Sequence, residues 1–133
     1  MHEYQPTSPI SPPVRVLLVE DDSGAGEPLA LSLAMHGYQV TWAMSGAEAL
    51  SAVRSPAVDP SIVLIDLNLP DQDGVQLARA LRSEHIQAPL VLVSGQPQAE
   101  IEQASRQTGA VAAFQKPVTP SRIAAAISDA LAA

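Results

Sequence analysis

The sequence predicts an α/β fold, a three-layer sandwich in which a five-stranded parallel sheet lies between helices. Short aliphatic runs alternate with longer segments whose apolar residues recur at helical spacing. The run over residues 61–66 shows no polar alternation before its terminal acid, which is typical of a parallel strand covered on both faces. Because parallel neighbours need crossover connections, five strands alternating with five helices favour a sheet wrapped on both sides.

The N-terminal segment, residues 1–13, is expected to be a flexible tail. It contains four prolines and almost no large aliphatic side chains, so burial cannot offset the entropy of ordering. We therefore expect the folded domain to occupy residues 14–133. A chain of 133 residues, 47% of them hydrophobic, has room for one such domain and excludes a multidomain enzyme.

The first half of this domain begins with a strand over residues 16–19, which is apolar and ends in three acids. The helix that follows ends at Gly37, whose missing side chain suits the left-handed conformation of a helix cap. Residues 38–42 form the second strand, and Trp42 is expected to serve in packing. The next helix starts at Ser45 and ends near Arg54, since Ser45 and Glu48 have the spacing of a capping box.

The second half repeats this alternation. Pro89 and Gly109 each end a helical pattern, and Thr119 followed by Pro120 supplies the cap and first residue of the last helix. The expected elements are a strand over 61–66, a helix around 75–81, a strand over 90–94, a helix over 98–108, a strand over 112–116, and a helix from 120 onward.

Polar side chains stand where four of the five strands end, and in open α/β sheets ligands bind outside these carboxyl ends. The strand-end residues are Glu20, Asp21, Asp66, Ser94 and Lys116. If the second strand lies at an edge, these residues converge on one crevice.

The chemistry of this set indicates a magnesium-dependent phosphoryl site. Three carboxylates close together cannot all stay ionised unpaired, so a hard divalent cation such as Mg²⁺ and Lys116, the only lysine in the sequence, would balance them. Asp66 would be the nucleophile, because a carboxylate can accept a phosphoryl group as an aspartyl phosphate. Lys116 and Mg²⁺ would neutralise charge on the transferred oxygens.

Composition excludes several other classes of function. A formal charge of −7 and an aromatic content of 3% argue against direct nucleic-acid binding by this domain. No cysteine is available for disulfides or thiol catalysis, and no apolar run could span a bilayer. We expect a cytoplasmic protein without a membrane segment.

From about Arg15 to its C-terminus, the sequence resembles the receiver domain of two-component response regulators. The motifs that carry the resemblance are Val19-Glu20-Asp21-Asp22, Ile65-Asp66-Leu67-Asn68-Leu69-Pro70 followed by Asp73-Gly74, Val93-Ser94-Gly95, and Lys116-Pro117. They occur in the family's order and at its usual separations.

The resemblance implies a flavodoxin-like fold with strand order 2-1-3-4-5. It also implies a phosphorylation-activated signalling switch that takes its phosphoryl group from a sensor histidine kinase or a histidine phosphotransfer protein and acts on a downstream protein target. The implied roles are phosphoacceptor and metal ligand for Asp66, Mg²⁺ ligand for Asp21, acidic-pocket member acting through water for Glu20, metal ligation by the Asn68 backbone carbonyl, switch hydroxyl for Ser94, and counter-ion for Lys116.

Three features depart from the family pattern or from a simple helix. Ala113 stands where the family usually has a switching aromatic ring, and Phe114 follows on the opposite side of the strand. Pro28 falls in the first helix, which is therefore expected to begin late or bend. The helix over 98–108 has Ile101 as its only large aliphatic anchor, so we expect it to move when Ser94 responds to phosphorylation.

Two alternatives to the switch remain. One is an enzyme with an aspartyl-phosphate intermediate, like haloacid-dehalogenase hydrolases, but these place an acid two residues after the nucleophile, where this chain has Asn68. The other is a degenerate receiver that serves only in docking. The small side chains of residues 124–126 in the last helix would also permit dimerisation through the last two helices.

Overall fold

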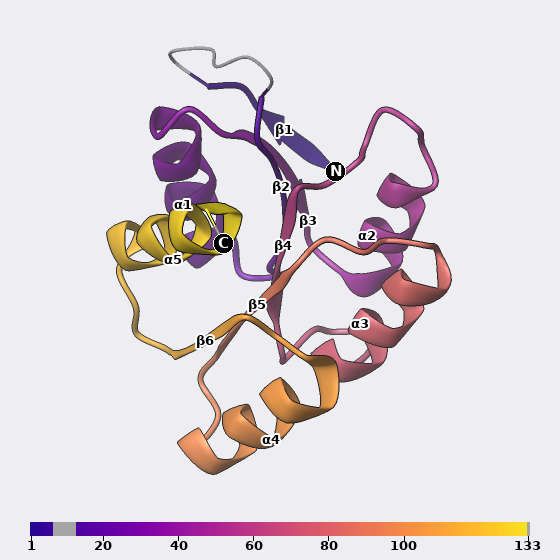
Figure 1. The fold of residues 1–133 in the computed structure, drawn as a ribbon, viewed down its shortest axis with the longest axis vertical. Coiled ribbons are helices and arrows are strands. Elements are labelled where there is room, and N and C mark those ends of the chain that lie inside the picture. Colours follow the sequence, from indigo (N-terminus) through magenta and orange to yellow (C-terminus); the bar gives the residue numbers. More distant parts are fainter. Residues whose placement is uncertain (7–12, 133) are drawn as a thin grey trace.

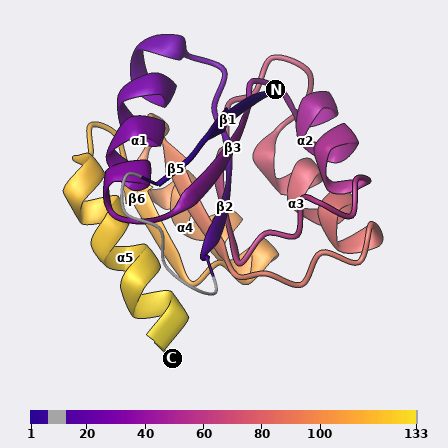
Figure 2. The same cartoon turned by 90° about the horizontal axis from the view of Figure 1, so that it is seen from above.

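The sheet of the computed structural model, which describes residues 1–6 and 13–132, lies between two layers of helices (Figures 1 and 2). Its strands are β1 (His2–Tyr4), β2 (Arg15–Val19), β3 (Gln39–Ala43), β4 (Ile62–Asp66), β5 (Leu90–Ser94) and β6 (Ala112–Gln115). Its helices are α1 (Ser23–Met35), α2 (Gly46–Val53), α3 (Gly74–Ser83), α4 (Gln98–Thr108) and α5 (Pro120–Ala132). All ten elements predicted from the sequence are present.

The strand order is β1-β3-β2-β4-β5-β6. Without β1, it is the order 2-1-3-4-5 that the family resemblance implies, with each neighbouring pair parallel. Helices α1 and α5 cover one face of the sheet and α2, α3 and α4 the other, as in a doubly wound fold. This order brings the carboxyl ends of β2, β4, β5 and β6 together at one edge of the sheet.

The prediction of five strands is wrong by one, because residues 2–4 of the expected tail pair antiparallel with β3. His2 lies opposite Trp42 and Tyr4 opposite Val40, and the rings of His2 and Tyr4 contact the Trp42 indole at centroid distances of 5.0 and 6.3 Å. Aromatic contact and an open strand edge thus order a segment that lacks aliphatic residues. Residues 7–12, the middle of the expected tail, lie outside the described residues.

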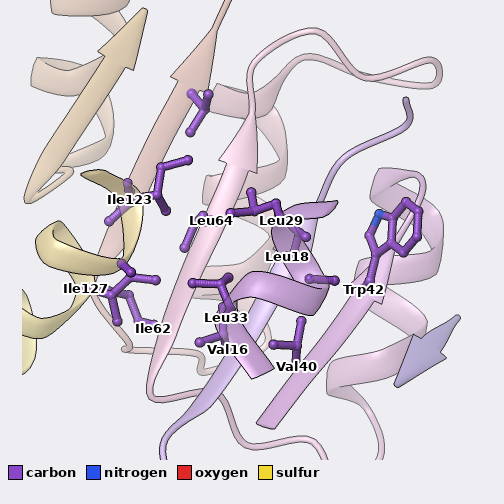
Figure 3. Packing of buried hydrophobic residues seen from close by; sticks show 14 residues of the cluster. Val16, Leu18, Leu29, Leu33, Val40, Trp42, Ile62, Leu64, Ile123 and Ile127 are labelled. Atoms are coloured by element: carbon purple, nitrogen blue, oxygen red, sulfur yellow. The ribbon is translucent and has the colours of Figure 1, made fainter. Parts of the chain in front are cut away.

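Two hydrophobic clusters form the core, one on each face of the sheet. On one face, α1 and α5 pack against residues such as Leu18 and Leu64, as Figure 3 shows. On the other face, α2, α3 and α4 pack against residues such as Leu17 and Ile65. Neighbouring residues of one strand therefore point to opposite clusters, which explains why β4 and β5 are apolar up to their last residue.

Most helix termini follow the predicted signals, but α3 ends at Ser83, well ahead of Pro89, and α1 also differs from expectation. Ser45 Oγ accepts a hydrogen bond from Glu48 N at 3.1 Å, which confirms the predicted cap of α2. Of the two alternatives expected for α1, a late start is wrong, since this helix begins at Ser23 and contains Pro28, whereas a bend stays a prediction. The Asp22 side chain accepts from Gly24 N, and its carbonyl accepts from Gly26 N, so the first turn closes before the proline.

The helices found in residues 1–6 and 13–132 can be compared with the length and hydrophobicity of a membrane-spanning helix. None of them has both the length and the apolar character needed to cross a bilayer.

Two glycines of α1 provide a test of this packing. A Cβ on Gly26 would lie 2.3 Å from Trp42 Cζ2, whereas a Cβ on Gly24 would approach only the Asp22 side chain, at 3.3 Å. We expect Gly26→Ala to lower the free energy of unfolding by about 1–3 kcal/mol through overpacking, although alanine favours a helix. Gly24→Ala is the control and should leave stability unchanged or raise it by up to about 1 kcal/mol. Urea unfolding measures both, and equal stability of the two variants would contradict the packing described.

Candidate functional site

The candidate site lies at the carboxyl ends of β2, β4 and β6, where Lys116 joins two acids from different strands. Val19 pairs with Ile65 in the parallel ladder, and Glu20 and Asp66 are the next residue of each strand. Lys116 Nζ donates to Glu20 Oε1 at 2.7 Å and to Asp66 Oδ2 at 3.0 Å. Residues separated by 96 and 50 positions in the sequence thus form one ion-paired group.

A third carboxylate completes the acidic group. One oxygen each of Glu20, Asp21 and Asp66 lie within 4.8 Å of one another. Glu20 and Asp66 are buried, with 5% and 6% of their surface exposed, whereas Asp21 is exposed. Asp21 and Asn68 line the same surface hollow, so the acidic group is open to solvent on that side.

The charge balance of the group fits a divalent cation. Burial and the neighbouring Asp66 raise the pKa of Glu20 from 4.5 to about 7, and the hydrogen bond from Lys116 only partly opposes this shift. Burial alone would lower the pKa of Lys116, but its hydrogen bonds to Glu20 and Asp66 outweigh burial and raise the pKa above 10.5. One ammonium therefore leaves negative charge uncompensated among oxygen ligands, the donor set that Mg²⁺ prefers.

The loop after β4 orients Asp66. Asn68 N donates to Asp66 Oδ1 at 2.9 Å, so each carboxylate oxygen of Asp66 accepts one hydrogen bond. Asn68 forms an isolated antiparallel bridge with Asp73, whose side chain caps α3 through Gln76 N. The loop that carries the Asn68 carbonyl is thus closed on itself beside the acidic group.

Ser94 lies at the end of β5 and is fully buried. Its Oγ accepts a hydrogen bond from Gln96 N at 3.0 Å, and its carbonyl accepts from Lys116 N at 2.7 Å. The hydroxyl is therefore tied to the loop between β5 and α4, while its backbone is tied to the residue that binds Asp66.

The rings and small residues of β6 lie as the period-two rule predicts. Ala113 packs with the cluster that includes α4, whereas Phe114 packs with the cluster that includes α5. The Arg122 guanidinium lies over the Phe114 ring, 5.4 Å from its centroid. The ring of Phe114 thus lies on the face of the sheet opposite to Ala113.

Sequence reasoning missed three residues of the site. Gln96 Nε2 donates to Asn68 Oδ1 at 2.7 Å, and Gln115 Nε2 donates to the Gln96 carbonyl at 3.0 Å, which joins the loops after β4 and β5 to β6. Trp42 Nε1 donates to the Glu20 carbonyl at 2.8 Å, a role beyond the packing predicted for it. The sequence could have indicated Gln96 as a site residue, because it lies two positions after Ser94. No feature of the sequence indicated a role for Trp42 at the site.

Comparison with known proteins agrees with this geometry. Residues 16–128 match the model of the response regulator receiver domain. The chain is 34% identical over 119 residues to the transcriptional regulatory protein GlrR of Escherichia coli (strain K12). This match covers 90% of this chain and 26% of GlrR. It is 34% identical over 105 residues to the response regulator MprA of Mycolicibacterium vanbaalenii. That match covers 79% of this chain and 45% of MprA. The chain thus spans less than half the length of these curated relatives.

Solved structures show the same fold. A CheY-like response regulator receiver domain protein from Methanospirillum hungatei has a TM-score of 0.82 at 27% identity, covering 90% of this chain and 94% of that one. The non-phosphorylated HemR receiver domain from Leptospira biflexa has a TM-score of 0.79 at 31% identity, covering 90% of this chain and 95% of that one. With the match to the family model over most of its length, the chain belongs to the family of response regulator receiver domains.

Proposed function

We propose that the chain is a phosphorylation-activated signalling switch in which Asp66 accepts a phosphoryl group with the help of Mg²⁺. The observation that carries this proposal is the ion pair of Lys116 with both Glu20 and Asp66, next to the exposed carboxylate of Asp21. Two buried acids cost stability when their charge is not fully compensated, so folding alone does not account for them. A lysine beside these acids, at a site that a cation can reach, suits phosphoryl transfer.

The proposed step is a displacement at phosphorus. An oxygen of the Asp66 carboxylate forms the new P–O bond and the P–N bond of a phosphohistidine breaks. The electron pair of that bond stays on the imidazole nitrogen of the donor protein, which takes up a proton from solvent. Lys116 stabilises charge on the phosphoryl oxygens. Asp21, Asp66 and the Asn68 carbonyl would hold Mg²⁺, with Glu20 acting through water, and the ion would supply further charge neutralisation.

Partners and location follow from this chemistry. The donor is a sensor histidine kinase or a histidine phosphotransfer protein, the setting is the cytoplasm, and the output is docking on a protein target. This domain is not proposed to bind nucleic acid directly, because its net charge of −7 would repel the phosphate backbone. The helices α4 and α5 are the surface through which two copies would dimerise.

The hydrolase alternative has less support at this site. In an enzyme that hydrolyses its aspartyl phosphate, an acid two residues after the nucleophile would move the proton. Here that residue is Asn68, whose side-chain oxygen accepts a hydrogen bond from Gln96. The chain is therefore proposed as a signalling receiver and not as an enzyme that turns over a metabolite.

Phosphorylation at Asp66 is the first test. Incubation of the chain with acetyl phosphate and Mg²⁺ should add one phosphoryl group, detected by intact mass spectrometry. Asp66→Asn should abolish the addition, since the nucleophilic oxygen pair is lost, and omission of Mg²⁺ should reduce it strongly. Asp59→Asn, which changes an exposed acid at the far edge of the sheet, is the matched control and should be modified like wild type.

Two results would contradict the proposal. Unmodified wild-type protein would favour a docking-only module. Rapid release of phosphate from ordinary phosphomonoesters would favour the enzyme.

The raised pKa of Glu20 predicts a pH dependence in the metal-free protein. The folded state holds the Glu20 proton up to about pH 7, whereas the unfolded state loses it near 4.5. The folded state therefore binds more protons between these values, and stability falls as the pH rises through this window, by up to about 3 kcal/mol. Glu20→Gln, which cannot ionise, should lose this part of the pH dependence.

Urea unfolding of both proteins in EDTA between pH 4.5 and 8 measures this effect. Relative to Glu20→Gln, wild type should become less stable across the window, and Mg²⁺ should reverse part of the loss above pH 7. A constant difference between the two proteins would show that the Glu20 pKa is not raised.

Helix α4 is proposed to respond to phosphorylation. Ile101 and Ala104 are its buried residues, and the loop before it is held by the bond from Gln96 N to Ser94 Oγ. If the Ser94 hydroxyl turns to a phosphoryl group, this bond breaks and α4 loses protection. Amide hydrogen exchange with and without beryllofluoride should differ across residues 98–108, with α2 as an internal reference, and equal protection would refute the movement.

A further inference from the structure

Trp42 lies between the N-terminal strand and the turn that carries the acidic group. Trp42 is 3% exposed, and its indole lies against Gly26 of α1, where an added Cβ would come within 2.3 Å of Trp42 Cζ2. The indole Nε1 donates a buried hydrogen bond to the carbonyl of Glu20 at 2.8 Å. Trp42 is the only tryptophan of the chain and supplies the one side-chain contact recorded for this carbonyl among the described residues.

The backbone of Glu20 is held by β3 on both sides. Its N–H donates to the Ala43 carbonyl at 3.0 Å, and its carbonyl accepts from Trp42. That carbonyl belongs to the peptide group that joins Glu20 to Asp21. The indole therefore fixes the peptide from which two of the three clustered carboxylates project.

The position of the indole is in turn set from two sides. The absence of a side chain at Gly26 in the first turn of α1 gives the ring its space, since a Cβ there would overlap it. On the other side, β1 places the rings of His2 and Tyr4 against the indole. The register of β1 on β3, with His2 opposite Trp42, brings these rings to the same face of the sheet.

We propose that Trp42 is a positioning residue for the metal-binding turn and that β1 holds it in place. The inference deepens the proposed function, on which it rests, by coupling Mg²⁺ binding at the acidic group to pairing of the N-terminal strand. Such coupling is reciprocal, so whatever loosens β1 weakens Mg²⁺ binding, and Mg²⁺ in turn strengthens the pairing of β1 with β3.

A purely structural role for Trp42 makes a different prediction. If the indole only fills the core, its replacement lowers stability and leaves the affinity of the folded protein for Mg²⁺ unchanged. The measurement that separates the two roles is therefore Mg²⁺ affinity, compared between variants of similar stability.

The experiment is a Mg²⁺ titration of the ¹⁵N-labelled full chain, followed by the amide signals of Asp66 and Asn68. Trp42→Phe keeps a ring at this position and removes the hydrogen-bond donor. We expect it to weaken Mg²⁺ binding about 3- to 10-fold, the range that loss of one hydrogen bond allows. Ile127→Val, which trims a fully buried side chain of α5, is the stability-matched control and should bind Mg²⁺ like wild type.

A second variant tests the part assigned to β1. Tyr4→Ala removes a ring from the indole and leaves the bond from Trp42 to Glu20 possible, so Mg²⁺ binding should weaken by a smaller factor, about 2- to 3-fold. In wild type, Mg²⁺ should slow amide exchange in β1 and in the residues of β3 that pair with it. Ile127→Val should show the same slowing.

The outcomes separate the inference from the proposed function. Wild type that shows no Mg²⁺-dependent shifts at Asp66 and Asn68 would overturn the metal site and, with it, the inference. Normal Mg²⁺ binding by wild type and equal affinity in Trp42→Phe would overturn the inference alone. Weaker binding in Ile127→Val, to the same extent as in Trp42→Phe, would assign the effect to stability and also overturn it.

Discussion

The arrangement of this receiver domain depends on electrostatic repulsion among three carboxylates that share one ammonium. Glu20 and Asp66 are buried beside Asp21, and Lys116 bonds to both buried acids. Burial, together with the neighbouring Asp66, raises the pKa of Glu20, so the group is costly to keep fully ionised. A parallel sheet can hold it, because the ladder of backbone hydrogen bonds fixes the strand ends regardless of which charges stand there.

Around this group, polar contacts join loops that are remote in sequence. The amides of Gln96 and Gln115 connect the loops after β4 and β5 to β6, and Ser94 Oγ is bonded within the same network. Ala113 leaves no ring on the α4 side of β6, and Phe114 packs with the cluster that includes α5. In the proposed switch, a change of hydrogen-bond partners in this network would take the place of a side-chain rotation.

Most of the fold follows from the sequence, since β2, β4 and β5 are aliphatic runs and most helix ends carry a capping or stop signal. Convergence of Glu20, Asp66 and Lys116 was predictable as well, because strand ends of a parallel sheet must meet at one edge. The strand β1 was not, because its stability comes from rings that meet Trp42 and not from local pattern. The same holds for the start of α1, where the Asp22 cap closes the first turn ahead of Pro28. Contacts between distant residues decided the first case, and a local cap by Asp22 decided the second.

The pairing of β1 with β3 also bears on how the molecule behaves at high concentration. A terminal parallel strand such as β3 would otherwise offer five residues of unpaired backbone donors and acceptors to any other extended chain. With β1 in place, the outermost strand on that side is three residues long and carries the charged side chain of Glu3. Short, charged margins are poor templates for intermolecular β-pairing. The N-terminal strand thereby guards this side of the sheet against aggregation.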